Sequence, residues 1–301
     1  MPRYAYPIIP LAKALGKRVV IHLHDYQPVS YTAVMFHSDS FRSDFSRTFH
    51  YEFHEHGLMR ALITQPFVSL NRLSAYWVLM ADAVIYVSKR QCEVILCGLP
   101  ELRDRASVIY NPLPEMKFLG KNLSSEPSFL YLGSVSYVKG FNVLIKAIEL
   151  LSDKPYRIYM TRITNVNMLP SALRNRVMAV GEIPYNELPR LHYGAYALLF
   201  PSIWKEPLPY VIIESMLMGT LPIASRTGGI PEILEGTPTE KYMFTPGEAG
   251  ELAEKIEDIT SLSPGEIAEI SIQLKENMWS KFNVEEVKRN FLGILISSNH
   301  S

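Results

Sequence analysis

Two glutamates lie eight positions apart in the stretch of this sequence that is richest in features able to do chemistry. Glu206 is followed by Pro207 and Pro209, and the apolar run that contains Glu214 ends at Gly219. Prolines suit the first turn of a helix, because the N–H groups there have no partner within the helix. Glycine suits the position just after a helix ends. The sequence therefore predicts a helix that begins shortly after Glu206 and carries Glu214.

The start of such a helix can bind a phosphate, because free N–H groups and a partial positive charge attract anions there. The two carboxylates would repel a phosphate, but they accept hydrogen bonds from sugar hydroxyls. Together these groups indicate a site for a nucleotide sugar. The alternative is that Glu206 only caps the helix and Glu214 is a solvated helix residue. Since apolar residues surround Glu214 in this helix, we expect its carboxylate to be partly buried and to have a partner.

Short apolar runs that alternate with helical patterns must position this helix. They indicate parallel strands covered on both faces, and hence an α/β fold with doubly wound sheets. The predicted strands are residues 18–24, 81–88, 106–111, 129–133, 156–160, 176–181, 195–202 and 221–225. Prolines from Asn111 to Glu115 and the polar stretch up to Pro127 predict a domain boundary. We therefore divide the chain into residues 1–115, 116–283 and a C-terminal helical segment, 284–301.

The motif around the two glutamates is similar to the donor-binding signature of the retaining glycosyltransferases of family 4 (glycosyl transferases group 1), which share the GT-B fold. The similarity consists of PS-x₃-EP at residues 201–207, the Glu206-x₇-Glu214 pair and GGIPEIL at residues 228–234. It covers the second domain fully and only the later part of the first. The resemblance implies two Rossmann-like domains, of which the first is incomplete, because only about three strands precede the boundary where about six are common.

The resemblance also implies roles for individual residues. It implies that Glu206 holds the donor sugar, that Glu214 holds the ribose, and that His24, at the end of the first strand, lies near the reacting carbon. Lys139 is placed to meet the diphosphate, so the predicted catalytic residues are His24, Glu206 and Lys139. The predicted donor-binding residues are Gly133, Ser134, Lys139, Gly181, Ile183, Glu206, Leu208, Pro209, Tyr210, Val211 and Glu214.

One position departs from the family pattern. Family members have an arginine directly after the glycine of the turn that contains Lys139, and this chain has Ser134 there. The diphosphate would thus have one cationic partner fewer. Lys205 and Arg162 are candidates to replace the missing charge, and the sequence leaves that choice open.

The resemblance implies transfer of a hexosyl group from a nucleoside diphosphate sugar to an acceptor hydroxyl, with the anomeric configuration retained, in polysaccharide or glycoconjugate biosynthesis. The acceptor would be a glycan, a lipid or a small molecule. Positive groups around the diphosphate can replace a divalent cation, so we expect no metal and no cofactor. Two alternatives remain: a non-catalytic nucleotide-sugar-binding or assembly protein derived from such an enzyme, and a sugar-nucleotide epimerase of the same fold.

Composition excludes several classes of partner. The 301 residues include 30 basic and 30 acidic side chains, so no overall attraction to nucleic acid is expected. No signal peptide is evident, and the apolar stretch 62–88 is interrupted by polar residues, which predicts no membrane span. Cys92 and Cys97 are expected to be reduced. We therefore expect a cytoplasmic protein, with peripheral membrane contact left open.

Residues 26–69 are aromatic and only weakly periodic, and we expect them to form a long, irregular segment. The resemblance implies that this segment lies near the acceptor. His50 and His54 would share a helix face if this segment were helical, but no full set of metal ligands accompanies them. The incomplete first domain should expose a sheet edge. That edge predicts self-association or a companion segment.

Overall fold

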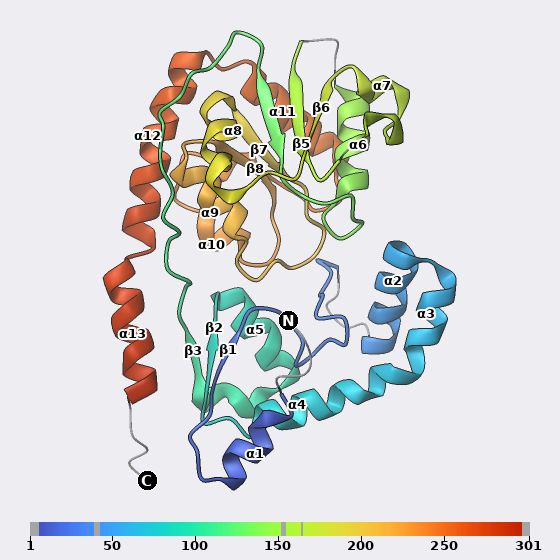
Figure 1. Cartoon of the computed structure of the whole chain (residues 1–301), viewed down its shortest axis with the longest axis vertical. Coiled ribbons are helices and arrows are strands. Elements are labelled where there is room, and N and C mark those ends of the chain that lie inside the picture. Colours follow the sequence, from blue (N-terminus) through green and yellow to red (C-terminus); the bar gives the residue numbers. More distant parts are fainter. Residues whose placement is uncertain (1–5, 39–42, 152–154, 164, 297–301) are drawn as a thin grey trace. The chain divides into compact units, whose positions relative to one another are not determined.

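The computed structural model describes residues 6–38, 43–151, 155–163 and 165–296, which form two compact units (Figure 1). The first unit contains the chain up to Pro112, the short segment Trp204–Leu208, and the chain from Phe282 onward. The second contains Leu113–Ile203 and Pro209–Lys281. Both have parallel sheets with helices packed on them, which confirms the predicted α/β class. The segment 204–208 differs from the predicted division, which placed all of residues 116–283 together.

The first unit is built on three parallel strands in the order β1 (Val20–Leu23), β2 (Ala83–Tyr86) and β3 (Ala106–Val108). Two helices contribute to its core, α4 (Asn71–Leu79) through Val78 and α5 (Lys89–Gly98) through Ile95, and both side chains are fully buried. All of β2 is buried, as expected for a strand that has neighbours on both sides and apolar cover.

Residues 44–70 are helical, so the prediction of a long irregular segment is wrong there. They form α2 (Asp44–His56), α3 (Leu58–Thr64) and a 3₁₀ segment, η2 (Gln65–Leu70). The hydroxyl of Ser43 accepts a hydrogen bond from the Ser46 N–H at the start of α2. Gly57 ends α2 with a φ of 88°. These end signals are local. The buried residues of α2 are the polar Arg47, Thr48 and Glu52, so the apolar pattern did not reveal this helix.

Three further elements belong to the first unit. They are α1 (Ile8–Ala14), η3 (Pro100–Arg105) and α13 (Val284–Ile296). Helix α13 contacts this unit at two described places: Arg18 Nη1 donates to the Leu295 carbonyl at 3.0 Å, and the rings of His22 and Phe291 lie 5.9 Å apart. Residues 297–301, the end of the predicted C-terminal segment, lie outside the described residues.

The second unit has a six-stranded parallel sheet in the order β6-β5-β4-β7-β8-β9. Its strands are β4 (Ser128–Tyr131), β5 (Arg157–Thr161), β6 (Val177–Gly181), β7 (Ala197–Phe200), β8 (Leu221–Ser225) and β9 (Met243–Phe244). The chain winds outward from β4 to β6, returns to β7 beside β4, and winds outward again to β9. Ligands of such sheets bind beyond the carboxyl ends of the strands where this reversal occurs.

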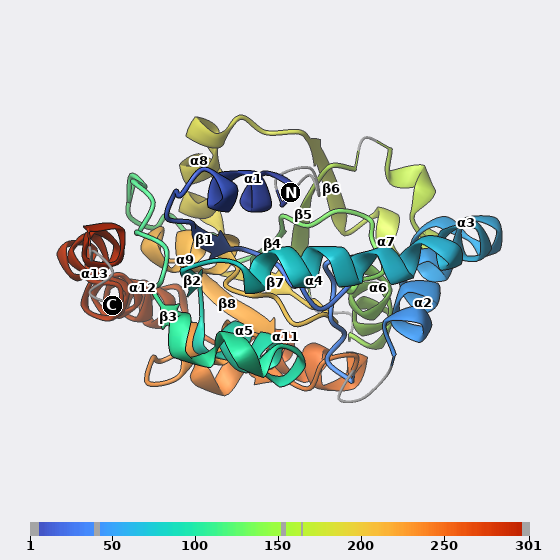
Figure 2. The same ribbon diagram turned by 90° about the horizontal axis from the view of Figure 1, so that it is seen from below.

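Helices cover both faces of this sheet (Figures 1 and 2). On one face α6 (Phe141–Leu150) packs against α11 (Ala249–Thr260), and on the other α9 (Tyr210–Leu217) packs against α12 (Pro264–Lys281). Shorter elements complete the unit: η4 (Val166–Met168), α7 (Ser171–Arg174), η5 (Tyr185–Glu187), α8 (Leu188–Gly194), α10 (Ile230–Leu234) and η6 (Glu240–Tyr242). Strand β8 lies where the sequence predicted it.

A buried polar cluster ties the segment before β4 to the rest of the second unit. The Lys121 ammonium donates to the carbonyl of His192 at 2.7 Å, to the carbonyl of Ala195 at 2.8 Å and to Thr220 Oγ1 at 2.8 Å. The His192 ring contacts the same hydroxyl at 2.9 Å. This cluster joins α8, the turn before β7 and the turn before β8.

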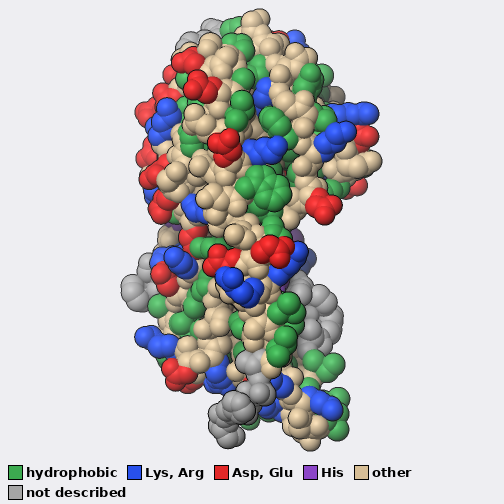
Figure 3. Space-filling model, turned by 90° about the vertical axis from the view of Figure 1, so that its left-hand side faces the viewer, with side chains coloured by type: hydrophobic (Ala, Val, Ile, Leu, Met, Phe, Trp, Pro, Cys, Tyr) green, Lys and Arg blue, Asp and Glu red, His purple; other side chains and the backbone are tan. Residues whose placement is uncertain are grey.

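Charge on one face of the molecule is mixed by sign. On the face shown in Figure 3, Lys and Arg side chains alternate with Asp and Glu side chains and form no large area of one sign. No helix of the described residues combines the length and the apolar character that a membrane crossing requires.

Candidate functional site

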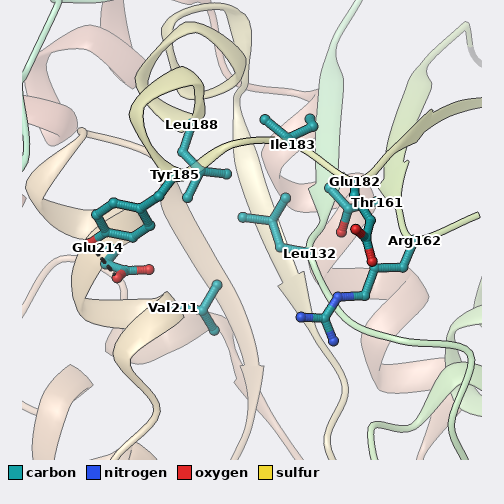
Figure 4. A pocket seen from close by; sticks show the side chains of 9 residues that line it. All are labelled: Leu132, Thr161, Arg162, Glu182, Ile183, Tyr185, Leu188, Val211 and Glu214. Carbon is teal, nitrogen blue, oxygen red and sulfur yellow. Dashed lines mark hydrogen bonds between the residues drawn. The ribbon is translucent and has the colours of Figure 1, made fainter.

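A cavity of about 390 Å³ opens at the carboxyl ends of β4, β5 and β6, entirely within the second unit (Figure 4). Its size is in the usual range for a small-molecule site. Nine residues line it, from the three strand ends, from η5 and α8, and from the first turns of α9: Leu132, Thr161, Arg162, Glu182, Ile183, Tyr185, Leu188, Val211 and Glu214. The cavity thus lies beyond the carboxyl ends of the strands and includes the end of β4, one of the two strands at the reversal.

Glu214 contributes a carboxylate to this cavity from the second turn of α9. Its Oε1 accepts a hydrogen bond of 2.8 Å from the Tyr185 hydroxyl (Figure 4). Burial raises the pKa of Glu214, and the bond from Tyr185 opposes that rise. The other residues of α9 near it, such as Ile213 and Met216, are buried. The expected partner for Glu214 is thus confirmed, and its carboxylate faces a space that a ligand can enter.

The loop after β4 contains two glycines at positions where a Cβ atom would lie too close to its neighbours. A Cβ at Gly140, where φ is 70°, would lie 1.8 Å from the Pro201 carbonyl oxygen. A Cβ at Gly133 would lie 2.7 Å from the Tyr131 ring, whose hydroxyl donates to the Ser134 carbonyl at 2.8 Å. Close packing therefore fixes this loop against the segment after β7.

Lys139 and Ser134 both belong to this loop. The Lys139 ammonium lies 6.0 Å from the centre of the Phe200 ring, at the end of β7. Neither residue lines the cavity directly, but Leu132, which does, immediately precedes Gly133. Gly133 and Ser134 thus follow a residue that lines the cavity, and Lys139 lies near the end of β7.

The ends of β5 and β6 form the opposite wall. The Arg162 N–H donates to the Gly181 carbonyl at 2.8 Å, which aligns the two strand ends. Ile183 follows Gly181 in the chain and lines the cavity. Of the predicted donor-binding residues, Ile183, Val211 and Glu214 therefore share one cavity, and Gly181 supports its wall.

The start of α9 supplies the fourth side. Pro209 precedes the first helical residue, Tyr210, with extended backbone, so the helix begins where the prolines predict. Leu208 and Pro209 are buried, and Val211 lines the cavity. Burial, together with the nearby Glu214 carboxylate, raises the pKa of Tyr210. The first turn of α9 therefore borders the cavity through Val211, and its Ile212 N–H donates to the Pro209 carbonyl at 3.2 Å.

His24 lies in the first unit, directly after β1. The turn that follows is fixed by Gln91, whose amide donates to the carbonyls of Leu23 at 3.2 Å and Asp25 at 3.0 Å. The His24 ring lies 4.3 Å from that of His22. Partial desolvation lowers the pKa of His24, and the charge of Asp25 opposes the effect. His24 is thus an exposed ring at the carboxyl end of a parallel strand, as predicted.

Glu206 belongs to the first unit as well. The Trp204 indole N–H donates to its carboxylate, and both residues are part of the segment that packs on residues 26–36. Trp204 pairs with Phe36 in an antiparallel bridge, and the Lys205 N–H donates to the Met35 carbonyl at 2.6 Å. This local packing explains why residues 204–208 group with the first unit, although they stand between β7 and α9 in the chain.

Within the described ranges, no group of three or more His, Cys, Asp and Glu side chains is arranged to hold a metal ion. The His50 and His54 rings do lie 4.4 Å apart on α2, as the helical spacing indicates. A described pair without further acidic or sulfur ligands does not make a closed metal site.

Sequence reasoning missed six residues that line the cavity. These are Leu132, Thr161, Arg162 (considered only as a replacement cation), Glu182, Tyr185 and Leu188. Most of them stand at or just after the end of a predicted strand. That position was the available signal, since parallel strands bring their carboxyl ends to one edge. Tyr185 had no such signal, because its role depends on the contact with Glu214.

Comparison with known proteins relates part of this chain to a family of glycosyltransferases. Residues 126–261 match the model of the family Glycosyl transferases group 1. An uncharacterised glycosyltransferase of Methanocaldococcus jannaschii is 26% identical over 178 residues, covering 50% of this chain and 44% of that protein. The O-antigen chain mannosyltransferase RfbU of Salmonella typhimurium is 31% identical over 137 residues, covering 44% of this chain and 38% of that protein. The matches span less than half the length of these curated relatives.

A similar solved structure is that of Anabaena HepE, determined in complex with UDP and glucose. It superposes with a TM-score of 0.71 at 19% identity, covering 98% of this chain and 76% of HepE. The likeness extends over both units and confirms the predicted fold. The chain thus has the GT-B fold, and its residues 126–261 match the family Glycosyl transferases group 1.

Proposed function

We propose that the protein is a retaining glycosyltransferase that moves a hexosyl group from a nucleoside diphosphate sugar to an acceptor hydroxyl. The observation that carries this proposal is the cavity in which the Glu214 carboxylate, the first turn of α9 and the strand ends of β5 and β6 come together. It combines an acceptor for hydroxyl hydrogen bonds with an anion-binding helix start. The bound UDP and glucose of HepE, a protein of the same fold, agree with such a ligand.

In the proposed mechanism, the nucleoside binds between Glu214 and Ile183, with the ribose hydroxyls donating to the Glu214 carboxylate. The diphosphate lies at the start of α9. As the bond from the sugar to the diphosphate breaks, negative charge grows on the leaving phosphate oxygens. The N–H groups of the first turn of α9 and the Lys139 ammonium stabilise that charge. Glu206 holds the hydroxyls of the donor sugar, and His24 holds the sugar near its reacting carbon.

Proton transfer needs no separate base in this scheme. The leaving phosphate oxygen accepts the proton of the acceptor hydroxyl on the same face of the sugar, which retains the anomeric configuration. The acceptor is a hydroxyl of a glycan, a lipid or a small molecule. The product test is the anomeric configuration of the transferred sugar, read by NMR.

Nucleotide binding is tested first. We expect one of the nucleoside diphosphates UDP, GDP and ADP to raise the melting temperature. A ligand at a concentration of one hundred times its dissociation constant stabilises the folded protein by about 2.7 kcal/mol. Glu214→Ala should lower the affinity for that nucleotide about 100-fold, since hydrogen bonds to a charged group contribute about 1.5–3 kcal/mol each. Titration calorimetry measures the loss directly.

Glu254→Ala is the matched control, because Glu254 is an exposed glutamate on α11 of the same unit and does not line the cavity. It should bind the nucleotide as the unchanged protein does. Equal affinity of Glu214→Ala and the unchanged protein would refute the site. Binding without any turnover of the matching nucleotide sugar would favour a non-catalytic binding protein instead.

We propose that transfer requires no metal. The positive end of α9 and Lys139 balance the charge of the diphosphate in place of a divalent cation. Treatment with EDTA should therefore leave the rate of nucleoside diphosphate release unchanged in an assay with donor and acceptor. A loss of activity that Mg²⁺ restores would contradict this prediction.

A further inference from the structure

Arg162 has an unusual backbone conformation at the end of β5. Its φ is 60°, in the left-handed region that non-glycine residues rarely adopt. The β5–β6 register shifts between Met160 and Thr161, and the hydrogen bond from the Arg162 N–H to Gly181 follows that shift. Such a conformation costs about 1 kcal/mol or more and persists where the surrounding structure enforces it, often at ligand sites.

This conformation turns the side chain over the cavity. Figure 4 shows the Arg162 guanidinium beneath Leu132, extended toward the middle of the cavity in the direction of Val211, and away from Ile183. Its charge therefore faces the start of α9 and not the wall formed by the end of β6.

Strand order explains what the guanidinium can reach. Strand β5 stands between β6, whose end carries Ile183, and β4, whose end leads into the loop with Ser134. Neighbouring strands are about 4.8 Å apart, and an arginine side chain spans that distance. A ligand that extends from the β6 end to the start of α9 must pass over Arg162.

The charges in the cavity require a cation at this place. Of the nine lining residues, Glu182 and Glu214 are carboxylates, and Arg162 is the one with a cationic side chain. Ser134, in the adjacent loop, is neutral. A diphosphate that enters beside two carboxylates is repelled unless a positive group lies close to it. An arginine is suited to this task, because its guanidinium can donate two parallel hydrogen bonds to phosphate oxygens.

We propose that Arg162 binds the diphosphate of the donor nucleotide and supplies the positive charge that Ser134 does not. This inference rests on the function proposed above. It assigns the diphosphate, and not the base, as the partner of the guanidinium. Arg162 is thus a binding residue for the leaving group of the reaction.

The test is to remove the side chain without straining the backbone. Glycine adopts a φ of 60° without steric cost, so Arg162→Gly should fold without backbone strain at this position. Calorimetry is run with three pairs of probes: UDP and uridine, GDP and guanosine, ADP and adenosine. For the pair that binds, Arg162→Gly should lower the affinity for the diphosphate about 10- to 100-fold, as expected for the loss of a charge-assisted hydrogen bond. The affinity for the nucleoside should not change. Lys146→Gln removes an exposed cation on α6 outside the cavity and should leave both affinities unchanged.

The outcomes separate this inference from the proposed function. If the unchanged protein binds none of the six probes, the proposed function fails, and the inference fails with it. If it binds a diphosphate and Arg162→Gly binds it equally well, the inference alone is wrong. If Arg162→Gly lowers the affinity for the nucleoside as much as the affinity for the diphosphate, the guanidinium contacts the base, and the inference is again wrong. Ser134→Arg in the Arg162→Gly background should restore part of the affinity for the diphosphate.

Discussion

Glu206→Gln should lower the rate of sugar transfer about 10²- to 10³-fold, with the affinity for the nucleoside diphosphate unchanged. The change keeps the shape of the side chain and removes its charge. Donor hydroxyls would then donate to a neutral amide oxygen, which accepts a weaker hydrogen bond than a carboxylate does. Loss of one well-placed polar group in a transition state costs about 3–4 kcal/mol.

Glutamine is the appropriate substitution because of Trp204. The Trp204 indole donates to the Glu206 carboxylate, and a glutamine carbonyl oxygen can accept the same hydrogen bond. The packing of residues 204–208 should therefore persist. Alanine at this position would leave the indole N–H without its acceptor and would mix a structural effect with the chemical one.

The rate is measured as nucleoside diphosphate released from the nucleotide sugar that binds, with and without acceptor. Glu101→Gln is the control, because Glu101 is an exposed glutamate of the same unit in η3. Transfer by Glu206→Gln at the rate of the unchanged protein would show that the carboxylate holds no reacting sugar. A matching loss of nucleoside diphosphate affinity would assign Glu206 to the nucleotide instead.

Lys121→Met should have the largest effect on stability, a loss of about 3 kcal/mol in the free energy of unfolding of the second unit. Methionine fills the space of the lysine stem but donates no hydrogen bonds. The carbonyls of His192 and Ala195 then lose the ammonium that lies 2.7 and 2.8 Å away. Each buried acceptor left without its donor costs about 1–3 kcal/mol.

Such a loss should lower the melting temperature by about 6–12 °C for a domain of this size. Lys117→Met is the matched control, because Lys117 is an exposed lysine four positions earlier in the same segment. Its free energy of unfolding should lie within about 0.5 kcal/mol of that of the unchanged protein. Equal melting temperatures for the two variants would show that the buried ammonium does not hold this segment in place.

The same cluster predicts a dependence on pH. Burial lowers the pKa of Lys121 from 10.5 to about 7. Between these two values the unfolded chain binds more protons than the folded one, so the free energy of unfolding rises as the pH is raised from 7 toward 10.5. From pH 7 to pH 9, the urea midpoint of the unchanged protein should therefore rise relative to the midpoint of Lys121→Met. A constant difference between the two proteins would contradict this assignment.

The sequence determined much of this protein through local rules. Prolines before Tyr210 and the glycine after the apolar run located α9, and continuous apolar runs located the strands, because helix ends and buried strands depend on neighbouring residues. The motif around Glu206 and Glu214 pointed to a nucleotide-sugar site in a doubly wound fold. Helix α2 was not predicted, although Ser43 and Gly57 mark its ends, because its buried residues are the polar Arg47, Thr48 and Glu52.

Only the tertiary structure decided which side chains meet. The hydrogen bond from Tyr185 to Glu214 joins residues 29 positions apart. The two meet because η5, which carries Tyr185, belongs to the connection that returns from β6 to β7. The left-handed backbone of Arg162 follows from a register shift against β6, which no local pattern around residue 162 records. The attachment of Trp204–Leu208 to the first unit likewise rests on contacts with residues 26–36. Local propensity is set by neighbours in the chain, whereas these contacts are set by packing between segments that are distant in the chain.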